Sequence, residues 1–362
     1  MNPVASIPRY PTDVTSGWLS GVLGARGEPV EVREVDVQPV GTGQTGATYR
    51  VSVRYASDPG GLPDTFVIKL PAGDDTVRDR VALGYRSECA FYAAVADRVK
   101  IPVPQCFHCE ISADAADYVL LLADEAPAAQ GDQIAGCGEQ QARLAVRALA
   151  GLHGPTWCGP EWPTFPGLAM TQLDAAGAKG MGDVARMSAD ITVEKLGAKL
   201  DAADCATLKA AMDVVTPWVL ARPERFSLIH GDYRLDNMLF VPDGSAIRVV
   251  DWQTLGVGLP TRDLAFFTAT SLEPGLRAAL ERDLVGEYHT ALLDYGVSDY
   301  DRETCWQDYR FGAIQALLIS ALGFAFAVGT DRGDDMIVTM LRRSCRAVRE
   351  LGTLDLVENA AS

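Results

Sequence analysis

The segment His230–Phe240, HGDYRLDNMLF, combines acids and an amide with an abruptly apolar end. Asp232 lies five residues before Asn237, and a short apolar strand is expected to begin directly after Asn237. A carboxylate can accept a hydroxyl proton, and an amide oxygen is a ligand that Mg²⁺ accepts. The spacing therefore predicts a base, Asp232, held apart from a metal ligand, Asn237, by a short loop.

A second acid, Asp251, is expected to lie close to Asn237. The segments MLFV and AIRVVDW flank the turn PDGSA, which favours an antiparallel hairpin centred near Gly244. Facing residue numbers would then sum to about 488, placing Asn237 and Asp251 opposite each other with Cβ atoms about 5 Å apart. We predict that these two residues bind Mg²⁺. The alternative is that all three polar residues only cap turns.

A glycine-rich segment, GTGQTG, includes Gly41, Gly43 and Gly46. A dinucleotide-binding turn would need a helix after it, but the next residues alternate as a strand does. A phosphate-binding loop of the Walker type would need a lysine that is missing here. A strand–loop–strand flap over ATP phosphates fits both flanks. An ordinary glycine-rich hairpin is the alternative.

Two charged residues occur where apolar ones are expected. Lys69 lies within the apolar strand TFVIKL, and Glu88 lies in the apolar stripe of a helix expected over residues 78–99. Because an unpaired buried charge is costly, we expect Lys69 and Glu88 to pair and the ammonium to face α- and β-phosphates. The alternative is two unrelated side chains that reach solvent separately.

The elements that must position these residues divide the chain in two. Runs at residues 30–40, 48–55, 65–70, around Cys106 and at 118–123 predict strands, and the chain after Ala126 reads as mostly helical. We therefore expect an α+β fold with a small β-rich N-lobe (residues 1–125, nucleotide binding) and a larger, mostly helical C-lobe (residues 126–362, catalysis and substrate binding).

Net charge and composition limit the kinds of partner that we expect for this protein. The 362 residues carry a net charge of −16, which argues against nucleic acid and an anionic membrane surface. The N-terminal residues show no secretory signal pattern, and the uncharged run from Phe311 to Thr330 is interpreted as a buried helix rather than a membrane span. Cys106 and Cys109 form a CxxC on an expected strand, which favours reduced thiols in a cytoplasmic protein over a metal site.

Five features follow one another along the chain: GTGQTG, VIKL, Glu88, HGDYRLDN and VVDW. In this order they resemble the motifs of the kinase-like phosphotransferases, and most closely those of the aminoglycoside phosphotransferase and choline-kinase group. The segment DWQTLGVGLPTRDLAFF is similar to the ecdysteroid-kinase-like branch of that group. The resemblance covers about residues 35–330 and implies a protein-kinase-like bilobal fold with ATP and Mg²⁺ as cofactors.

The resemblance also implies roles for residues. Gly41, Gly43 and Gly46 would cover the phosphates, and Lys69, oriented by Glu88, would contact them. Asp124 and Ala126 would contact adenine through their backbone. Asp232 would be the base, with Asn237 and Asp251 as the metal ligands. Asp263 and His230 would brace the catalytic loop, and His153 is interpreted as a packed helix histidine.

Two departures weigh against a protein kinase. Gln253 replaces the glycine that follows the metal-binding Asp in protein kinases, and only twelve residues separate Asp251 from Asp263, which leaves little room for an activation segment. We expect an ATP-dependent kinase acting on a small-molecule alcohol. The rival interpretations are a catalytically inactive pseudokinase, a protein kinase, and an oxidoreductase that binds its dinucleotide through the glycine loop.

The sequence does not determine the identity of the acceptor alcohol. An aminoglycoside, an amino alcohol, a sugar and a steroid-like or lipid-like alcohol all fit the motifs. The helical segments 155–225 and 270–330 should determine it, and they contain aromatic residues that could line a pocket or form core: Trp157, Trp162, Trp218, Trp306 and Tyr309.

Overall fold

The chain folds into two compact units. A computed structural model describes residues 6–25, 29–40, 47–326 and 329–361. The N-terminal unit comprises the described parts of Met1–Arg98 together with Val103–Ala126 and Asp251–Thr254, and the C-terminal unit comprises the remainder. Residues 99–102 thus belong to the C-terminal unit and residues 251–254 to the N-terminal unit.

The N-terminal unit is built on one antiparallel sheet with the strand order β1-β2-β3-β5-β4. The strands are β1 (Val32–Pro39), β2 (Ala47–Tyr55), β3 (Thr65–Leu70), β4 (Cys106–Ile111) and β5 (Tyr118–Ala123). The alternation expected in β2 is present, because Val51 and Val53 are buried in the core. Strand β3 lies between β2 and β5, so Lys69 stands on an interior strand of the sheet.

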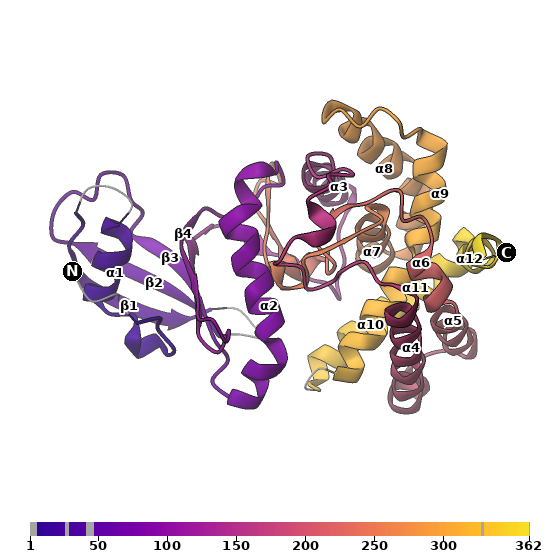
Figure 1. The fold of residues 1–362 in the computed structure, drawn as a ribbon, viewed down its shortest axis with the longest axis horizontal. Coiled ribbons are helices and arrows are strands. Elements are labelled where there is room, and N and C mark those ends of the chain that lie inside the picture. Colours follow the sequence, from indigo (N-terminus) through magenta and orange to yellow (C-terminus); the bar gives the residue numbers. More distant parts are fainter. Residues whose placement is uncertain (1–5, 26–28, 41–46, 327–328, 362) are drawn as a thin grey trace. The chain divides into compact units, whose positions relative to one another are not determined.

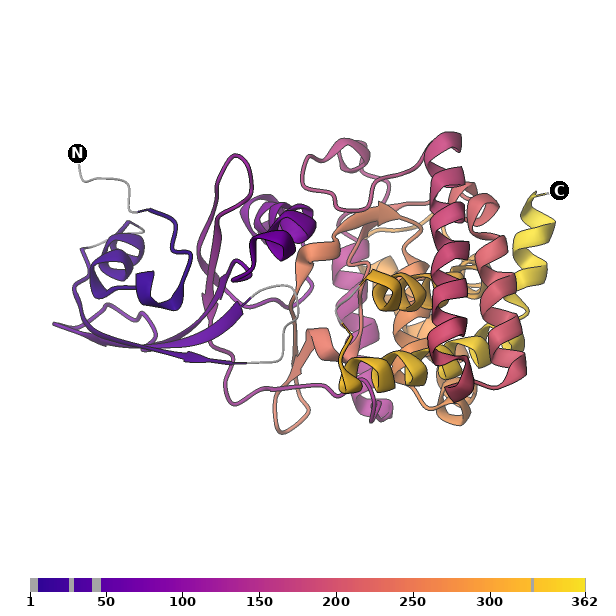
Figure 2. The same cartoon turned by 90° about the horizontal axis from the view of Figure 1, so that it is seen from below.

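Two helices cover the two faces of this sheet (Figures 1 and 2). Helix α1 (Ser16–Gly24) packs its apolar residues into a core that includes Val119 and Leu121 of β5. Successive residues of a strand point to opposite faces, and Tyr118 accordingly stacks on Tyr85 of α2 (Asp75–Ala94) at 4.2 Å. Helix α2 thereby carries Glu88 against the face opposite α1.

The C-terminal unit is mostly helical (Figure 2). Its helices are α3 (Glu139–His153), α4 (Ala175–Leu196), α5 (Ala202–Asp213), α6 (Val215–Leu220), α7 (Thr261–Ser271), α8 (Pro274–Asp294), α9 (Arg302–Gly312), α10 (Ile314–Phe326), α11 (Asp331–Leu351) and α12 (Thr353–Ala361). Across the described residues of both units there are also six short 3₁₀ helices: Pro11–Asp13, Ala96–Arg98, Trp162–Thr164, Gly197–Lys199, Leu235–Asn237 and Trp252–Thr254.

Two small antiparallel sheets in this unit carry the segments with the candidate chemistry. One pairs β7 (Ser227–Ile229) with β10 (Gly256–Gly258), and the other has the order β6 (Ala129–Gln130), β8 (Met238–Phe240), β9 (Ile247–Val249).

The hairpin after Asn237 is present, but its expected register is wrong by one residue. Met238 pairs with Val249, and the backbone N–H of Val250 donates to the carbonyl of Asn237 at 3.0 Å. Asn237 therefore lies opposite Val250, and Asp251 follows one residue later. The reason is the turn: Gly244 has φ +68° and accommodates a left-handed position that shifts the centre of the hairpin.

In the described residues, the uncharged run near the C-terminus supplies the last two residues of α9 and all of α10. Arg302–Phe326 is the one stretch among the described residues that is long and apolar enough to cross a membrane, and 61% of its most apolar window is buried. Burial of this kind is equally typical of a core helix, as expected from the sequence. The aromatic side chains of Trp162, Trp218, Trp306 and Tyr309 are also buried and belong to the core.

Candidate functional site

The carboxylate of Asp232 is held by two neighbours from its own loop. Arg234 donates from Nε to both carboxylate oxygens at 3.0 Å, and Asn237 donates from Nδ2 to Oδ2 at 3.0 Å. A carboxylate has about four acceptor positions, so these three hydrogen bonds leave room for another donor. The Asp232 side chain is 22% exposed, which gives such a donor access from solvent.

The backbone just before Asp232 is anchored by Asp263 of α7. The two oxygens of the buried Asp263 carboxylate accept hydrogen bonds from the backbone N–H groups of His230 at 2.6 Å and Gly231 at 3.0 Å. Gly231 has φ +83°, a conformation that favours glycine. The bracing role expected for Asp263 is therefore present in the geometry, and it explains why glycine precedes Asp232.

His230 strengthens the same anchor. Its Nε2–H donates to the carbonyl of Val250 at 3.0 Å, and its Nδ1 accepts from the backbone N–H of Asp232 at 3.3 Å. The imidazole thus joins the loop before Asp232 to the end of the hairpin that leads to Asp251, as expected for a bracing residue.

His153 is a packed helix histidine, as the sequence predicted. It is fully buried at the end of α3, where its Nδ1 accepts from the hydroxyl of Tyr288 at 2.7 Å and its Nε2 lies 3.4 Å from Asp263. Burial lowers the pKa of His153 from its ordinary value, and the nearby Asp263 only partly opposes this. The neutral imidazole therefore contacts the Asp263 carboxylate and helps to hold it in place.

The amide of Asn237 is oriented by its own hydrogen bonds. Its Nδ2 donates to the backbone carbonyl of Asp232 at 2.9 Å as well as to the carboxylate. Both bonds use the nitrogen, so the amide oxygen faces away from Asp232. An outward amide oxygen and a carboxylate are the donor types that Mg²⁺ prefers, and the chemistry of Asn237 and Asp251 fits that ion.

The N-terminal unit brings Lys69, Glu88 and Asp251 together. The Lys69 ammonium lies 2.7 and 2.8 Å from the two oxygens of Glu88 and 3.2 Å from Oδ1 of Asp251. The expected pair between Lys69 and Glu88 is therefore present. Asp251 is a further partner that the sequence interpretation did not assign to Lys69.

The electrostatics of this cluster favour a charged lysine. Burial opposes the charged form of Lys69, but the negative charges of Asp251 and Glu88 outweigh burial and raise its pKa above the ordinary value. Burial also raises the pKa of Glu88, and Lys69 opposes that shift. The Asp251 side chain is 34% exposed, so the cluster has one side open to solvent.

The segment around Asp251 has a constrained backbone. Asp251 itself has φ +68°, a left-handed conformation that is uncommon for residues other than glycine and is enriched at functional sites. The next residue, Trp252, stacks on Phe91 of α2 at 3.6 Å. Gln253 donates to Glu88 at 3.4 Å, and a Cβ atom on Gly84 would lie 3.1 Å from the Gln253 side chain. Helix α2 therefore fixes this segment by close contact.

The two residues expected to bind adenine lie just after β5. The Asp124 carboxylate accepts from Nε of Arg50 at 2.6 Å and from the backbone N–H of Ala126 at 3.2 Å. The hydrogen bond to Asp124 raises the pKa of Arg50 above its ordinary value. Contact of Asp124 and Ala126 with adenine stays a prediction, and a ligand at the Ala126 N–H would have to replace this bond. Gly41, Gly43 and Gly46 lie outside the described residues.

Two residues that touch the catalytic loop were missed by the sequence interpretation. Arg234 binds Asp232 and also donates to Asp236 at 2.8 Å, although it stands within the motif itself. Gln315 of α10 donates to the carbonyl of Gly231 at 3.4 Å. Its position as the first polar residue within a long uncharged run was the available signal.

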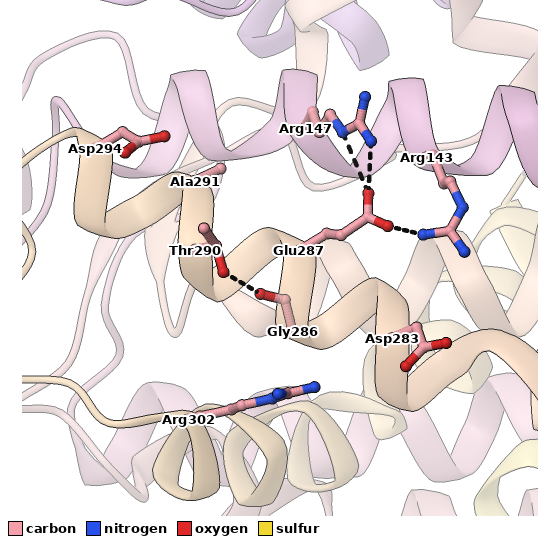
Figure 3. A pocket seen from close by; sticks show the side chains of 9 residues that line it. All are labelled: Arg143, Arg147, Asp283, Gly286, Glu287, Thr290, Ala291, Asp294 and Arg302. Atoms are coloured by element: carbon pink, nitrogen blue, oxygen red, sulfur yellow. Dashed lines mark hydrogen bonds and ion pairs between the residues drawn. The ribbon is translucent and has the colours of Figure 1, made fainter.

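The larger of the two best-defined cavities in the described part of the chain is unrelated to these residues. It has a volume of about 490 Å³ and lies between α3, α8 and α9. Figure 3 shows that Arg143 and Arg147 both reach Glu287, so these three charged side chains are engaged with one another. A smaller hollow of about 250 Å³ adjoins Arg302 and Trp306. We place the candidate chemistry at Asp232 and Lys69, because hydrogen-bonded acids and a paired lysine occur there.

No cluster of three or more His, Cys, Asp or Glu side chains that could hold a metal occurs within residues 6–25, 29–40, 47–326 and 329–361. None of the eight cysteines, all of which lie in the described residues, forms a disulfide, Cys106 and Cys109 included. Any metal at the candidate site would therefore need ligands from outside this set, such as an amide or a phosphate.

Comparison with known proteins identifies the family. A model of the phosphotransferase enzyme family matches residues 36–302, which is most of the chain. The chain belongs to this family. This confirms the resemblance to the aminoglycoside phosphotransferase and choline-kinase group that the motifs indicated.

Two solved structures share the fold of this phosphotransferase-family member. Ethanolamine kinase from Plasmodium vivax is 13% identical, with a TM-score of 0.53 over 86% of this chain and 82% of that one. A protein from Ralstonia eutropha, provisionally assigned as an aminoglycoside phosphotransferase, is 17% identical, with a TM-score of 0.50 over 94% of this chain and 99% of that one. The expected α+β, protein-kinase-like fold with a β-rich N-lobe and a helical C-lobe is confirmed.

A curated relative of the family member is much longer. Acyl-CoA dehydrogenase family member 10 of Mus musculus is 30% identical over 124 residues, which is 30% of this chain and 12% of the mouse protein. The chain therefore matches only about a tenth of that relative's length.

Proposed function

We propose that this chain transfers the γ-phosphoryl group of ATP to a hydroxyl group of a small molecule. The observation that carries the proposal is the Asp232 carboxylate, which Arg234 and Asn237 orient while Asp263 fixes the backbone of the preceding two residues. A partly exposed acid in a rigid loop is suited to position a hydroxyl group and accept its proton. Membership of a phosphotransferase family supports the same reaction type.

The proposed reaction is a direct transfer. The acceptor oxygen forms a bond to the γ-phosphorus as the bond between that phosphorus and the β-γ bridging oxygen breaks, and ADP leaves. The hydroxyl proton passes to Asp232. Catalysis of such transfers rests on positioning and on charge stabilisation, so the rigidity that Asp263 gives the loop contributes directly to rate.

The nucleotide is proposed to bind through the N-terminal unit. Lys69, held charged by Glu88, would contact the α- and β-phosphates, and Gly41, Gly43 and Gly46 would cover them with backbone N–H groups. Asp124 and Ala126 would contact adenine through their backbone. The interior position of Lys69 in the sheet and its two carboxylate partners support this assignment.

Asn237 and Asp251 are proposed to hold Mg²⁺, whose charge would offset that of the phosphate oxygens. The outward amide oxygen of Asn237 and the solvent-accessible carboxylate of Asp251 support the assignment. Because Asp251 also contacts Lys69, its carboxylate would couple the position of the ion to that of the lysine.

We place this reaction in the cytoplasm, with a small-molecule alcohol as partner and no role for nucleic acid or membrane insertion. Eight cysteines without a disulfide are typical of a reducing compartment. The net charge of −16 disfavours binding to nucleic acid.

The experiment is a phosphoryl-transfer screen of hydroxyl compounds with Mg²⁺ and ATP, comparing wild type, Asp232→Asn and Asp243→Asn. Asp232→Asn should lower kcat about 10²–10⁴-fold, the range for loss of a general base, while ATP affinity stays within about twofold. Asp243 is an exposed acid of the hairpin turn, so its variant should keep wild-type rates. Loss of ATP affinity in Asp232→Asn would instead make Asp232 a binding residue and contradict the proposed role.

A further inference from the structure

Helix α10 exposes an apolar end. Its last ten residues, LLISALGFAF, contain no charged side chain. Phe326 is 50% exposed, Ile319 and Leu322 are half-buried, and Gly323 is exposed. A helix at a protein surface ordinarily turns polar side chains to solvent. The apolar end of α10 is therefore a surface suited to bind an apolar partner.

The buried first turn of α10 contacts the loop that carries Asp232, and the stripe that starts there becomes exposed toward the end of the helix. Gln315, in the first turn of α10, donates to the carbonyl of Gly231, the residue before Asp232. At 3.6 residues per turn, Ile319, Leu322 and Phe326 lie within about 40° of Gln315 around the helix axis. These four residues form one stripe, which we call the α10 track. The track runs about 16 Å, at 1.5 Å per residue, from the loop to the exposed end.

A neighbouring helix, α11, also contacts the loop that carries Asp232. Met336, in the second turn of α11, has its sulfur 3.1 Å from Nη1 of Arg234, which in turn binds Asp232. Helices α10 and α11 pack against each other. The Asp232 loop therefore contacts α10 through Gln315 and α11 through Met336, and the α10 track starts at the first of these contacts.

We propose that the α10 track binds the apolar body of the acceptor, so that the substrate is an alcohol carrying a hydrocarbon chain or ring system. This rests on the proposed function, because Asp232 must act on the hydroxyl end of the same molecule. Burial of apolar surface is roughly proportional to area, about fourfold in affinity per methylene. A polyamine sugar or a small amino alcohol would leave the track uncovered.

A membrane surface is the other partner that an exposed apolar helix end could meet. The structure favours the acceptor, because the track starts at Gln315, which contacts the loop that carries Asp232, and because the net charge of −16 opposes binding to anionic lipids. The membrane therefore enters the test as an outcome.

The experiment measures kcat/KM with Mg²⁺ and ATP for 1,2-alkanediols of four to twelve carbons, with kanamycin and choline as polar acceptors. Wild type is compared with Phe326→Ser and Leu322→Ser on the track. The matched control is Leu293→Ser on α8, where Leu293 is 47% exposed. Calorimetric binding of 1,2-dodecanediol without ATP, and sedimentation with phosphatidylcholine vesicles, are measured for the same four proteins.

The expected result is a rise in kcat/KM of at least tenfold from four to twelve carbons in wild type and Leu293→Ser, reduced to less than threefold in Phe326→Ser and Leu322→Ser. Dodecanediol binding should weaken in the same two variants. Turnover of kanamycin or choline with no dependence on chain length would overturn the inference and leave the phosphotransferase proposal standing. A chain-length dependence equal in all four proteins would also overturn it.

Two outcomes separate the inference from the proposed function. If no acceptor is phosphorylated but dodecanediol binds wild type and not Phe326→Ser, the proposed function fails and the apolar site on α10 stands. Binding to vesicles that Phe326→Ser abolishes, with no diol binding, would assign the track to a membrane and overturn the inference.

Discussion

The carboxylate of Asp263 lies 2.6 Å from the backbone nitrogen of His230, 33 residues earlier in the chain. Its other oxygen accepts from Gly231 at 3.0 Å, and His153 lies behind it at 3.4 Å. One buried acid on α7 therefore fixes the backbone from which Asp232 projects. The catalytic loop is held by tertiary contacts rather than by its own sequence alone.

Replacing Asp263 should destabilise the C-terminal unit. In Asp263→Asn, only one oxygen remains for two backbone donors, and leaving a buried donor unpaired costs about 1–3 kcal/mol. We expect the free energy of unfolding, measured with urea and tryptophan fluorescence, to fall by about 2–3 kcal/mol. Asp335→Asn removes a surface ion pair with Lys199 and should change it by less than about 0.5 kcal/mol. Equal stability of wild type and Asp263→Asn would contradict the bracing role.

Glu88 should be more important for stability than a surface acid of the same unit. Glu88→Gln leaves Lys69 buried with only Asp251 as a charged partner, and breaking a buried pair costs about 3–5 kcal/mol. We expect a loss of about 3 kcal/mol, less than the full range because Asp251 remains. The matched control is Glu34→Gln, because Glu34 pairs with Arg54 at 3.4 Å with both side chains exposed. That change should cost less than about 1 kcal/mol. Similar losses in both variants would show that the Lys69 pair has no special role.

Acid should destabilise the protein through His153. Its folded pKa is lowered by burial, whereas the unfolded chain has an ordinary histidine pKa of about 6.5. Below that pH the unfolded chain binds more protons, so the free energy of unfolding falls as pH decreases from 6.5 toward the folded pKa, by up to about 1.4 kcal/mol per pH unit.

The measurement is urea unfolding of wild type and His153→Asn between pH 5 and 8. The stability difference between the two proteins should shrink as the pH falls, because the variant has lost this contribution. The control is His289→Asn, which changes a histidine that binds the carbonyl of Tyr300. Because His153 is intact in this variant, its free energy of unfolding should fall with decreasing pH as that of wild type does. A difference that stays constant over the whole range would show that His153 does not titrate below its ordinary pKa.

Metal-dependent nucleotide binding should require Asp251. ATP with Mg²⁺ at about a hundred times Kd adds roughly 2.7 kcal/mol to the stability of wild type, which for a chain of this size raises Tm by a few degrees. Asp251→Ala should lose the part of this shift that depends on Mg²⁺ and should abolish phosphoryl transfer. Thermal midpoints with Mg²⁺ alone, ATP alone and both together test this. A variant that retained activity within tenfold of wild type would exclude Asp251 as a metal ligand.

Gly151 should tolerate no side chain. A Cβ atom there would lie 2.7 Å from the backbone carbon of Lys100 and 2.8 Å from the nitrogen of Ile101. Overpacking costs about 1–3 kcal/mol, so Gly151→Ala should destabilise the protein by roughly 1–2 kcal/mol after the gain in helix propensity is subtracted. Gly180→Ala in α4, where a Cβ atom meets no neighbour, should stabilise it by about 0.5–1 kcal/mol. Urea unfolding of both variants checks the opposite signs.

Local sequence determined much of this protein. Alternation in β2, the apolar stripe of α2 and the charges at Lys69 and Glu88 predict their elements and their pairing, because burial of a charge demands a partner close by. The order of the motifs also determined the family and the two-lobe organisation, because both follow from the order of segments along the sequence.

Tertiary structure alone decided the rest. The register of the hairpin shifted by one residue because a turn backbone, not the strand pattern, sets it. Likewise, the hydrogen bonds of Asp263 and the contact of Gln315 with Gly231 join residues far apart in the chain. The exposure of the end of α10 depends on which helices pack around it. Such contacts depend on how helices pack in three dimensions, and residue spacing along the sequence carries no record of them.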